Sequence, residues 1–118
     1  MAQPSGEDKR EARRIGRKFV MRVAVDDGNP WPNWSLVTTS NLSVGGTLFI
    51  FDQPVKVGQS LFCKLHFADR QIDCKAKVIR FVGTFQKPLV QVAVGFEWES
   101  EKDRVYVEEF AKRYKEYP

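Results

Sequence analysis

Three arginines near the N-terminus, Arg13, Arg14 and Arg17, are the residues of this chain best suited to bind an anion. The guanidinium group is a rigid, permanently charged fork that forms paired hydrogen bonds with phosphate and with the O6 and N7 acceptors of guanine. Its flat face can also stack on an aromatic base. Because Arg13 and Arg17 are four residues apart in a segment that we expect to be flexible, both could contact one ligand.

A second polar segment follows about two dozen residues later, between two strand-like runs. It offers an amide, a hydroxyl and a glycine pair, at Asn41, Ser43, Gly45 and Gly46. The amide both donates and accepts hydrogen bonds, and either glycine lets the backbone approach a ligand or adopt a positive φ. With the arginines, these groups suit a ligand that carries phosphates and planar, acceptor-rich rings. No side chain here is a convincing catalyst, because the only histidine, His66, is expected on the outer face of a strand.

Six runs of alternating apolar and polar residues predict the strands that must position these groups. The runs are residues 19–25, 35–40, 47–51, 61–67, 72–78 and 90–98. Their short spacing and local turns favour an antiparallel barrel or sandwich, and we expect a mainly β, six-stranded antiparallel β-barrel. The alternation breaks at Ile79, which predicts a β-bulge beside Arg80 and Phe81. Trp98 shares its phase with apolar neighbours and is expected in the core.

The last segment changes to a helical period. Its apolar positions are Val107, Phe110, Ala111 and Tyr114. This stripe predicts a C-terminal α-helix at about residues 101–115 that lies across the barrel. Ser100 and Asp103 have the spacing of a capping box.

The two polar segments are predicted to meet in space. If the first two strands form a hairpin centred near Pro30, antiparallel pairing places Arg17 opposite Ser43. Directly opposed residues lie roughly 5 Å apart. The sequence therefore predicts one composite site at the rim of the barrel, built from an N-terminal arm and a turn.

Length and charge fit one domain with a basic arm. The chain has 118 residues, enough for one domain with a core. Residues 1–18 contain six basic and three acidic residues, whereas the remaining hundred contain 13 basic and 12 acidic ones. We interpret residues 1–12 as a flexible basic arm and residues 13–118 as a single barrel domain. A concentrated arm suits a compact anion better than a long nucleic acid. No signal peptide or membrane span is recognisable, so we expect a cytoplasmic protein without membrane insertion.

The cysteines and two tryptophans have simple structural interpretations. Cys63 and Cys74 stand without a CxxC pair, and one histidine is too few for a structural zinc site. Both fall in phase with apolar positions, which favours two reduced core cysteines, with a cross-strand disulfide as the alternative. Trp31 and Trp34 are interpreted as loop anchors on the barrel, although an exposed pair would indicate a protein partner.

The pattern RxxxR followed by D/NxSxxG, ahead of six strands and a helix, resembles the PilZ domain, the bacterial receptor for cyclic di-GMP. The resemblance covers about residues 10–114. The family's binding positions correspond to the paired arginines Arg13 and Arg17, the auxiliary Arg14, and Asn41, Ser43 and Gly46. The resemblance implies that the ligand is cyclic di-GMP, whose two phosphates and two guanines suit these groups.

The resemblance also implies a non-catalytic signalling module, without a cofactor or metal, of the kind that acts in motility and biofilm formation. In that family the arginine arm wraps the nucleotide when it binds, and this change would alter a surface for a protein partner. Family members bind one nucleotide or a stacked pair. Ala12, just before the first arginine, lacks the bulk or charge that would decide between them.

Two other functions stay open at this point. One is a PilZ-like protein–protein adaptor with weak or no nucleotide binding. The other is a small single-stranded nucleic-acid-binding barrel, which predicts a spread basic groove with interleaved aromatic residues and a steep salt dependence. The near-neutral charge of residues 19–118 argues against the second. An enzyme has the least support, because the chain offers no evident base, metal set or nucleophile.

Overall fold

The computed structural model describes residues 19–39 and 41–116, with side chains up to Arg113. Its elements are β1 (Phe19–Val25), β2 (Ser35–Thr39), β3 (Gly46–Phe51), β4 (Ser60–His66), β5 (Gln71–Gly83), β6 (Val90–Glu97) and α2 (Glu101–Glu116). The six predicted strands and the C-terminal helix are therefore confirmed. One boundary differs widely, because β5 continues to Gly83 instead of ending at Val78.

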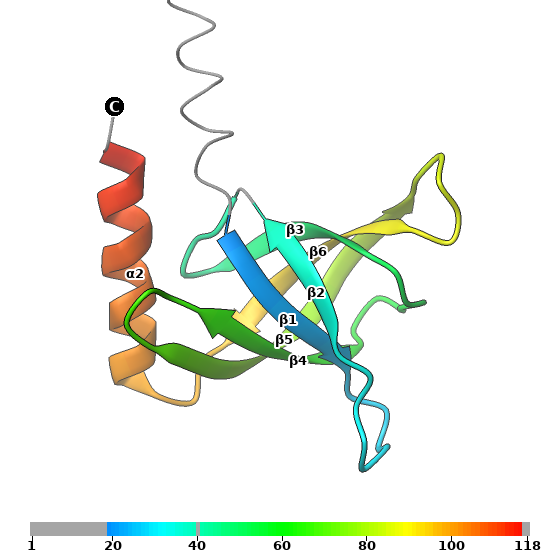
Figure 1. The fold of residues 1–118 in the computed structure, drawn as a ribbon, viewed down its shortest axis with the longest axis horizontal. Coiled ribbons are helices and arrows are strands. Elements are labelled where there is room, and N and C mark those ends of the chain that lie inside the picture. Colours follow the sequence, from blue (N-terminus) through cyan, green and yellow to red (C-terminus); the bar gives the residue numbers. More distant parts are fainter. Residues whose placement is uncertain (1–18, 40, 117–118) are drawn as a thin grey trace, which may run out of the picture.

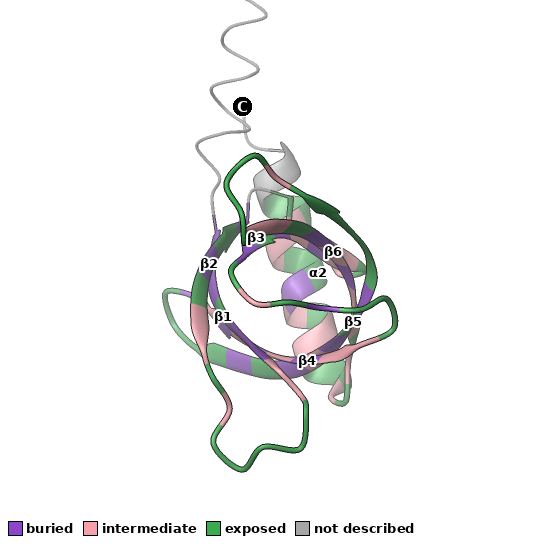
Figure 2. Ribbon diagram, turned by 90° about the vertical axis from the view of Figure 1, so that its right-hand side faces the viewer, coloured by how far each residue is buried: buried purple, intermediate pink, exposed green. Residues whose placement is uncertain are grey.

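All strand pairs are antiparallel, and the strand order is β2-β1-β4-β5-β6-β3. The sheet curls until its two edge strands, β2 and β3, approach each other, which gives a nearly closed barrel (Figure 2). At this seam the hydroxyls of Thr39 and Thr47 form a buried hydrogen bond. The expected antiparallel β-barrel is therefore present.

The β1–β2 hairpin is centred at Asn29, one residue before the predicted centre. Phe19 pairs with Thr39, whereas a hairpin centred at Pro30 would pair Phe19 with Asn41. The predicted register was therefore wrong by two residues. The loop explains the shift, because Gly28 has a positive φ of 84° and the Asn29 backbone N–H donates to Asp27 Oδ1 at 3.0 Å. A shift of two residues keeps every side chain on its predicted face.

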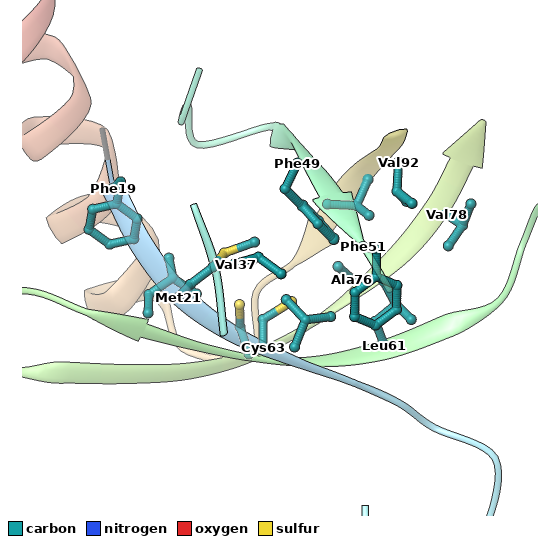
Figure 3. Packing of buried hydrophobic residues seen from close by; sticks show 14 of the residues in the cluster. Phe19, Met21, Val37, Phe49, Phe51, Leu61, Cys63, Ala76, Val78 and Val92 are labelled. Atoms are coloured by element: carbon teal, nitrogen blue, oxygen red, sulfur yellow. The ribbon is translucent and has the colours of Figure 1, made fainter. Parts of the chain in front are cut away.

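The barrel interior is filled by the apolar face of the strands (Figure 3). Met21, Leu61 and Phe51 are fully buried there. Cys63 and Cys74 are directly opposed on β4 and β5, and both are buried free thiols, which confirms the reduced core cysteines. A hydrogen bond with Cys63, together with burial, raises the pKa of the Cys74 thiol. The alternative of a cross-strand disulfide is not realised.

Helix α2 packs against one end of the barrel, opposite the end where β5 and β6 are joined (Figure 1). Val107 is fully buried, and the rings of Tyr106 and Phe110 meet Phe67 at centroid distances of 5.0 and 4.7 Å. The helix begins at Glu101 and is capped as predicted by Ser100, whose Oγ accepts a hydrogen bond from the backbone N–H of Asp103 at 3.3 Å. The amphipathic stripe thus covers an opening of the barrel.

A pH-sensitive hydrogen bond ties α2 to the β4–β5 turn. The Tyr106 hydroxyl donates to Asp69 Oδ1 at 2.6 Å, and this bond lowers the pKa of Asp69. A carboxyl with a lowered pKa stabilises the folded state above its unfolded pKa, and that stabilisation is lost as the pH falls through the folded pKa. The free energy of unfolding of the wild type should therefore fall more between neutral and acid pH than that of a Tyr106→Phe variant. Urea unfolding at about pH 6 and about pH 3 measures this difference.

The phenylalanine variant keeps the ring that packs on Phe67 and lies under the guanidinium of Arg70. It therefore isolates the hydroxyl. Equal losses of stability by both proteins between the two pH values would contradict the assignment.

Candidate functional site

The segment of residues 41–46 connects β2 to β3 at the end of the barrel where β1 begins (Figure 1). Phe19, the first described residue of β1, pairs with Thr39, two residues before Asn41. The strand that follows the arginine segment therefore starts beside the second polar segment, as the composite site requires. The arginines themselves, Arg13, Arg14 and Arg17, lie outside the described residues.

Ser43 and Gly46 build the corner of this segment. The Ser43 backbone N–H donates to the Gly46 carbonyl at 3.0 Å, and the Ser43 hydroxyl donates to the same oxygen at 3.3 Å. The Gly46 N–H in turn donates to Ser43 Oγ at 3.3 Å. The side chain that the sequence suggested for ligand binding therefore also holds the turn in shape. A hydroxyl fixed in this way is already oriented before any ligand arrives.

The structure gives Gly46 a role in strand packing that the sequence did not predict. Among the described residues, positive φ values occur at Gly28 and Gly58 and not at Gly45 or Gly46. Gly46 lies opposite Gly95 of β6, and a Cβ on Gly46 would overlap the carbonyl oxygen of Val94. Glycine is required at this position because β3 and β6 approach closely. Of the two alternatives that the sequence left open, a positive φ is therefore excluded for both glycines, whereas the approach of a ligand to this backbone stays a prediction.

Gly45 is less constrained than Gly46. A Cβ at Gly45 would meet only Ser43 Oγ, at 3.8 Å, which is ordinary contact. Its carbonyl accepts a hydrogen bond from the backbone N–H of Phe96 at 3.0 Å. Gly45 is exposed, so it leaves open space on the solvent side of the corner.

Trp98 supports the segment, a role that sequence reasoning missed. Its Nε1 donates to the carbonyl oxygen of Val44 at 2.8 Å, and its ring packs on Phe96 with centroids 5.0 Å apart. Trp98 is half-buried and packs against the core, so the core prediction holds in part. The only sequence signal for its hydrogen bond is that an indole N–H near a surface needs an acceptor.

Asn41 presents its amide to solvent. The residue is exposed, and its backbone N–H donates to Thr39 Oγ1 at 3.3 Å. The side-chain amide makes no hydrogen bond with any other described residue. It is therefore available for a base edge, a sugar hydroxyl or a phosphate.

The two loop tryptophans behave differently. Trp34 packs on Phe62 with centroids 6.5 Å apart, and Lys64 Nζ lies 5.0 Å from its ring, which confirms the anchor prediction for this residue. For Trp31 the prediction was wrong, because 83% of the residue is exposed. Its backbone N–H donates to Asn29 Oδ1 at 2.9 Å, so hydrogen bonds shape the loop without burial of the indole.

Two further predictions concern β4 and β5. The register of β5 against β6 shifts between Val78 and Arg80, which confirms the bulge at Ile79. His66 is half-buried on the side of β4 that alternates with the core residues, as predicted. Its Nε2 is buried and finds no hydrogen-bond partner among the described residues.

The described residues contain neither a metal-binding cluster nor a membrane-spanning helix. Within residues 19–39 and 41–116, no three His, Cys, Asp or Glu side chains are grouped so that they could hold a metal ion. In the same part of the chain, no helix has the length and apolar character needed to cross a membrane.

The chain belongs to the PilZ family, because the PilZ domain model matches residues 8–112. Among solved structures, it is similar to the Bacillus subtilis inhibitor of motility MotI/DgrA, with a TM-score of 0.67 and 14% identity over 83% of this chain and 47% of the other. It is also similar to the PilZ domain of CeSA from a cellulose-synthesizing bacterium, with a TM-score of 0.62 and 15% identity over 83% and 93%.

A third similar structure is MrkH of K. pneumonia, with a TM-score of 0.62 and 18% identity over 81% of this chain and 47% of MrkH. The chain thus spans about half the length of MotI and of MrkH. At these identities the likeness establishes the fold. No curated protein shows significant sequence similarity to the chain.

Proposed function

We propose that this protein is a cyclic di-GMP receptor that acts without catalysis. The observation that carries the proposal is the position of residues 41–46 beside the start of β1 in a PilZ domain. The ligand-binding groups are the guanidinium groups of Arg13, Arg14 and Arg17 and the corner that contains Asn41, Ser43, Gly45 and Gly46.

The roles of these groups follow from their chemistry. The arginines supply paired hydrogen bonds to guanine O6 and N7 and positive charge for the phosphates. The exposed amide of Asn41 bonds a base or sugar edge, and the corner that Ser43 holds offers backbone groups that are already oriented. Gly45 leaves room for the ligand to approach.

Nucleotide binding would change the surface that the protein presents to a partner. Fixing the arm costs about 1–2 kcal/mol per ordered residue, and a micromolar receptor needs a net free energy of only about −8 kcal/mol. Much of the interaction energy therefore goes into placing the arm against the rim. A protein partner that contacts this rim in the cytoplasm would distinguish the bound from the empty form, which is how the signal would be passed on.

A protein–protein adaptor is the second candidate, and the exposure of Trp31 favours it. A large aromatic side chain that stands in solvent at a loop tip is a common anchor for a partner. In this function, partner binding would persist without nucleotide. The single-stranded nucleic-acid barrel gains no such support, since Trp34 packs on Phe62 and residues 19–118 are nearly neutral.

Calorimetric titration tests the proposed receptor. Cyclic di-GMP should bind with a Kd in the micromolar range, and the stoichiometry will give one or two nucleotides per chain. Cyclic di-AMP is the matched control, because it has the same phosphates but lacks the guanine O6 acceptor, and it should bind at least about tenfold more weakly. No heat with cyclic di-GMP at tens of micromolar protein, or equal affinity for both nucleotides, would overturn the proposal.

A further inference from the structure

The second half of β5 is an unpaired sheet edge. β4 pairs with β5 only as far as Ser60 and Lys77, and the backbone of Val78 then bonds to Gly58 and Gln59. After the bulge, residues 80–83 pair with β6 alone. Their other edge faces no strand in the described part of the chain. Figure 1 shows this part of β5 (lime) projecting with β6 (yellow) away from the helix.

The projecting edge carries apolar side chains instead of the usual protection. Natural edge strands are guarded by lysine, proline or inward-pointing charge, because unpaired backbone groups invite another strand. Here Ile79, Phe81 and Val82 are all exposed, Val82 by 57%. Phe85, at the hairpin, is fully exposed. Arg80 is the one charged residue between Ile79 and Phe85.

A hollow lies on the paired side of this part of β5, because Ile50 of β3 and Gln91 of β6 belong to its lining. It has a volume of about 390 Å³ and is lined by Ile50, Gly83, Thr84, Phe85 and Gln91. Gly83 leaves it open, because no atom lies within 4 Å of the place that its Cβ would occupy.

The sequence along this edge, from residue 74 to residue 96, carries charge of one sign. Between Asp73 and Glu97 the sequence contains four basic residues and no acidic one. One of them, Lys75, pairs with Asp26 at 3.9 Å. The other three, Lys77, Arg80 and Lys87, form no ion pair with any described residue. A second copy of this chain would bring the same positive charges to the contact, whereas a partner with carboxylates would neutralise them.

We propose that residues 79–85 bind an extended segment of a partner protein that combines apolar and acidic residues, by addition of a strand to β5. Arg80 and Val82 share the outer face, where they pair with Ala93 and Gln91, whereas Phe81 faces the other way. A partner strand would therefore place carboxylates beside Arg80 and apolar side chains beside Phe81. The inference rests on the proposed function and deepens it, because it assigns to the expected protein partner a second surface, separate from the rim at residues 41–46 (Figure 1).

A short capped peptide of alternating valine and glutamate is the probe. Added to the nucleotide-free protein, it should shift the amide NMR signals of residues 79–85 and slow their hydrogen exchange. A peptide with lysine in place of glutamate should bind about fivefold more weakly. Arg80→Glu should reverse this preference, whereas Lys112→Glu, the same charge change on the exposed face of α2, should not.

Three results would overturn the proposal. The first is an absence of shifts at residues 79–85. The second is an Arg80→Glu variant that prefers the same peptide as the wild type. The third is a dimer in sedimentation whose formation shifts the same NMR signals, which would assign the edge to a second copy. Because no nucleotide is present, a failure of cyclic di-GMP binding in calorimetry is a separate result and leaves this measurement intact.

Discussion

Gly46→Ala is expected to lower the free energy of unfolding by about 2–4 kcal/mol, a large part of the total stability of a small domain. The new methyl group would overlap the Val94 carbonyl oxygen and lie 3.1 Å from its carbon. Both atoms belong to backbone within the β3–β6 ladder, so neither can move without breaking strand pairing. Urea unfolding followed by circular dichroism measures the change.

Gly45→Ala is the matched control. Its methyl group would make only one contact, at 3.8 Å with Ser43 Oγ, and Gly45 does not have a positive φ. We therefore expect a change within about 1 kcal/mol, in the stabilising direction if the unfolded chain is made stiffer. Equal destabilisation by both alanines would show that the strand contact at Gly46 is not the cause. The pair also shows whether loss of binding in a Gly46 variant reflects loss of the fold.

Arg17→Ala should weaken cyclic di-GMP binding by about 10- to 100-fold, because a paired arginine–guanine contact contributes roughly 1–3 kcal/mol. Arg13→Ala should have a similar effect if the two arginines each hold a guanine. Stability should change little, since the cluster of buried residues that holds the described barrel together begins at Phe19. Calorimetric titration of the folded variants gives the affinities.

Arg22→Ala provides the control for charge. Arg22 lies on the exposed face of β1, between Leu36 of β2 and Lys64 of β4, outside the predicted site. Its removal changes the net charge by the same amount and should leave the affinity within about twofold. If Arg22→Ala weakens binding as much as Arg17→Ala, the nucleotide responds to overall charge and the assigned roles are wrong.

Most of the fold could be predicted because side-chain alternation and burial agree along the strands. Met21, Cys63 and Ala76 lie in the core where their phase placed them. Alternation failed to predict the length of β5, since five consecutive exposed residues follow Val78, with apolar side chains among them. Pairing with β6 extends this strand, and that partner is distant in sequence.

The site could be predicted in outline but not in its internal contacts. The spacing of Asn41, Ser43 and Gly46 identified the segment, and the β1–β2 pairing placed it. The reason for Gly46 lies on β6, and the hydrogen bond from Trp98 spans 54 residues. Neither relation leaves a local pattern. The prediction for Trp31 was wrong because an aromatic residue in a loop suggests burial. Here hydrogen bonds such as that of the Trp31 backbone already shape the loop, and the sequence does not show this.

The seam between β2 and β3 has a mechanical consequence. The ladder that runs through the other strands does not continue across it, and the Thr39–Thr47 pair stands at the foot of residues 41–46. Widening the barrel at this line would cost side-chain packing and a few side-chain hydrogen bonds, those of Ser35 with Asp52 and Gln53 among them, without breaking a backbone ladder. A force applied at residues 41–46 would therefore separate β2 from β3 before it separates any hydrogen-bonded pair of strands. The circumference of the barrel is thus easier to change than its length.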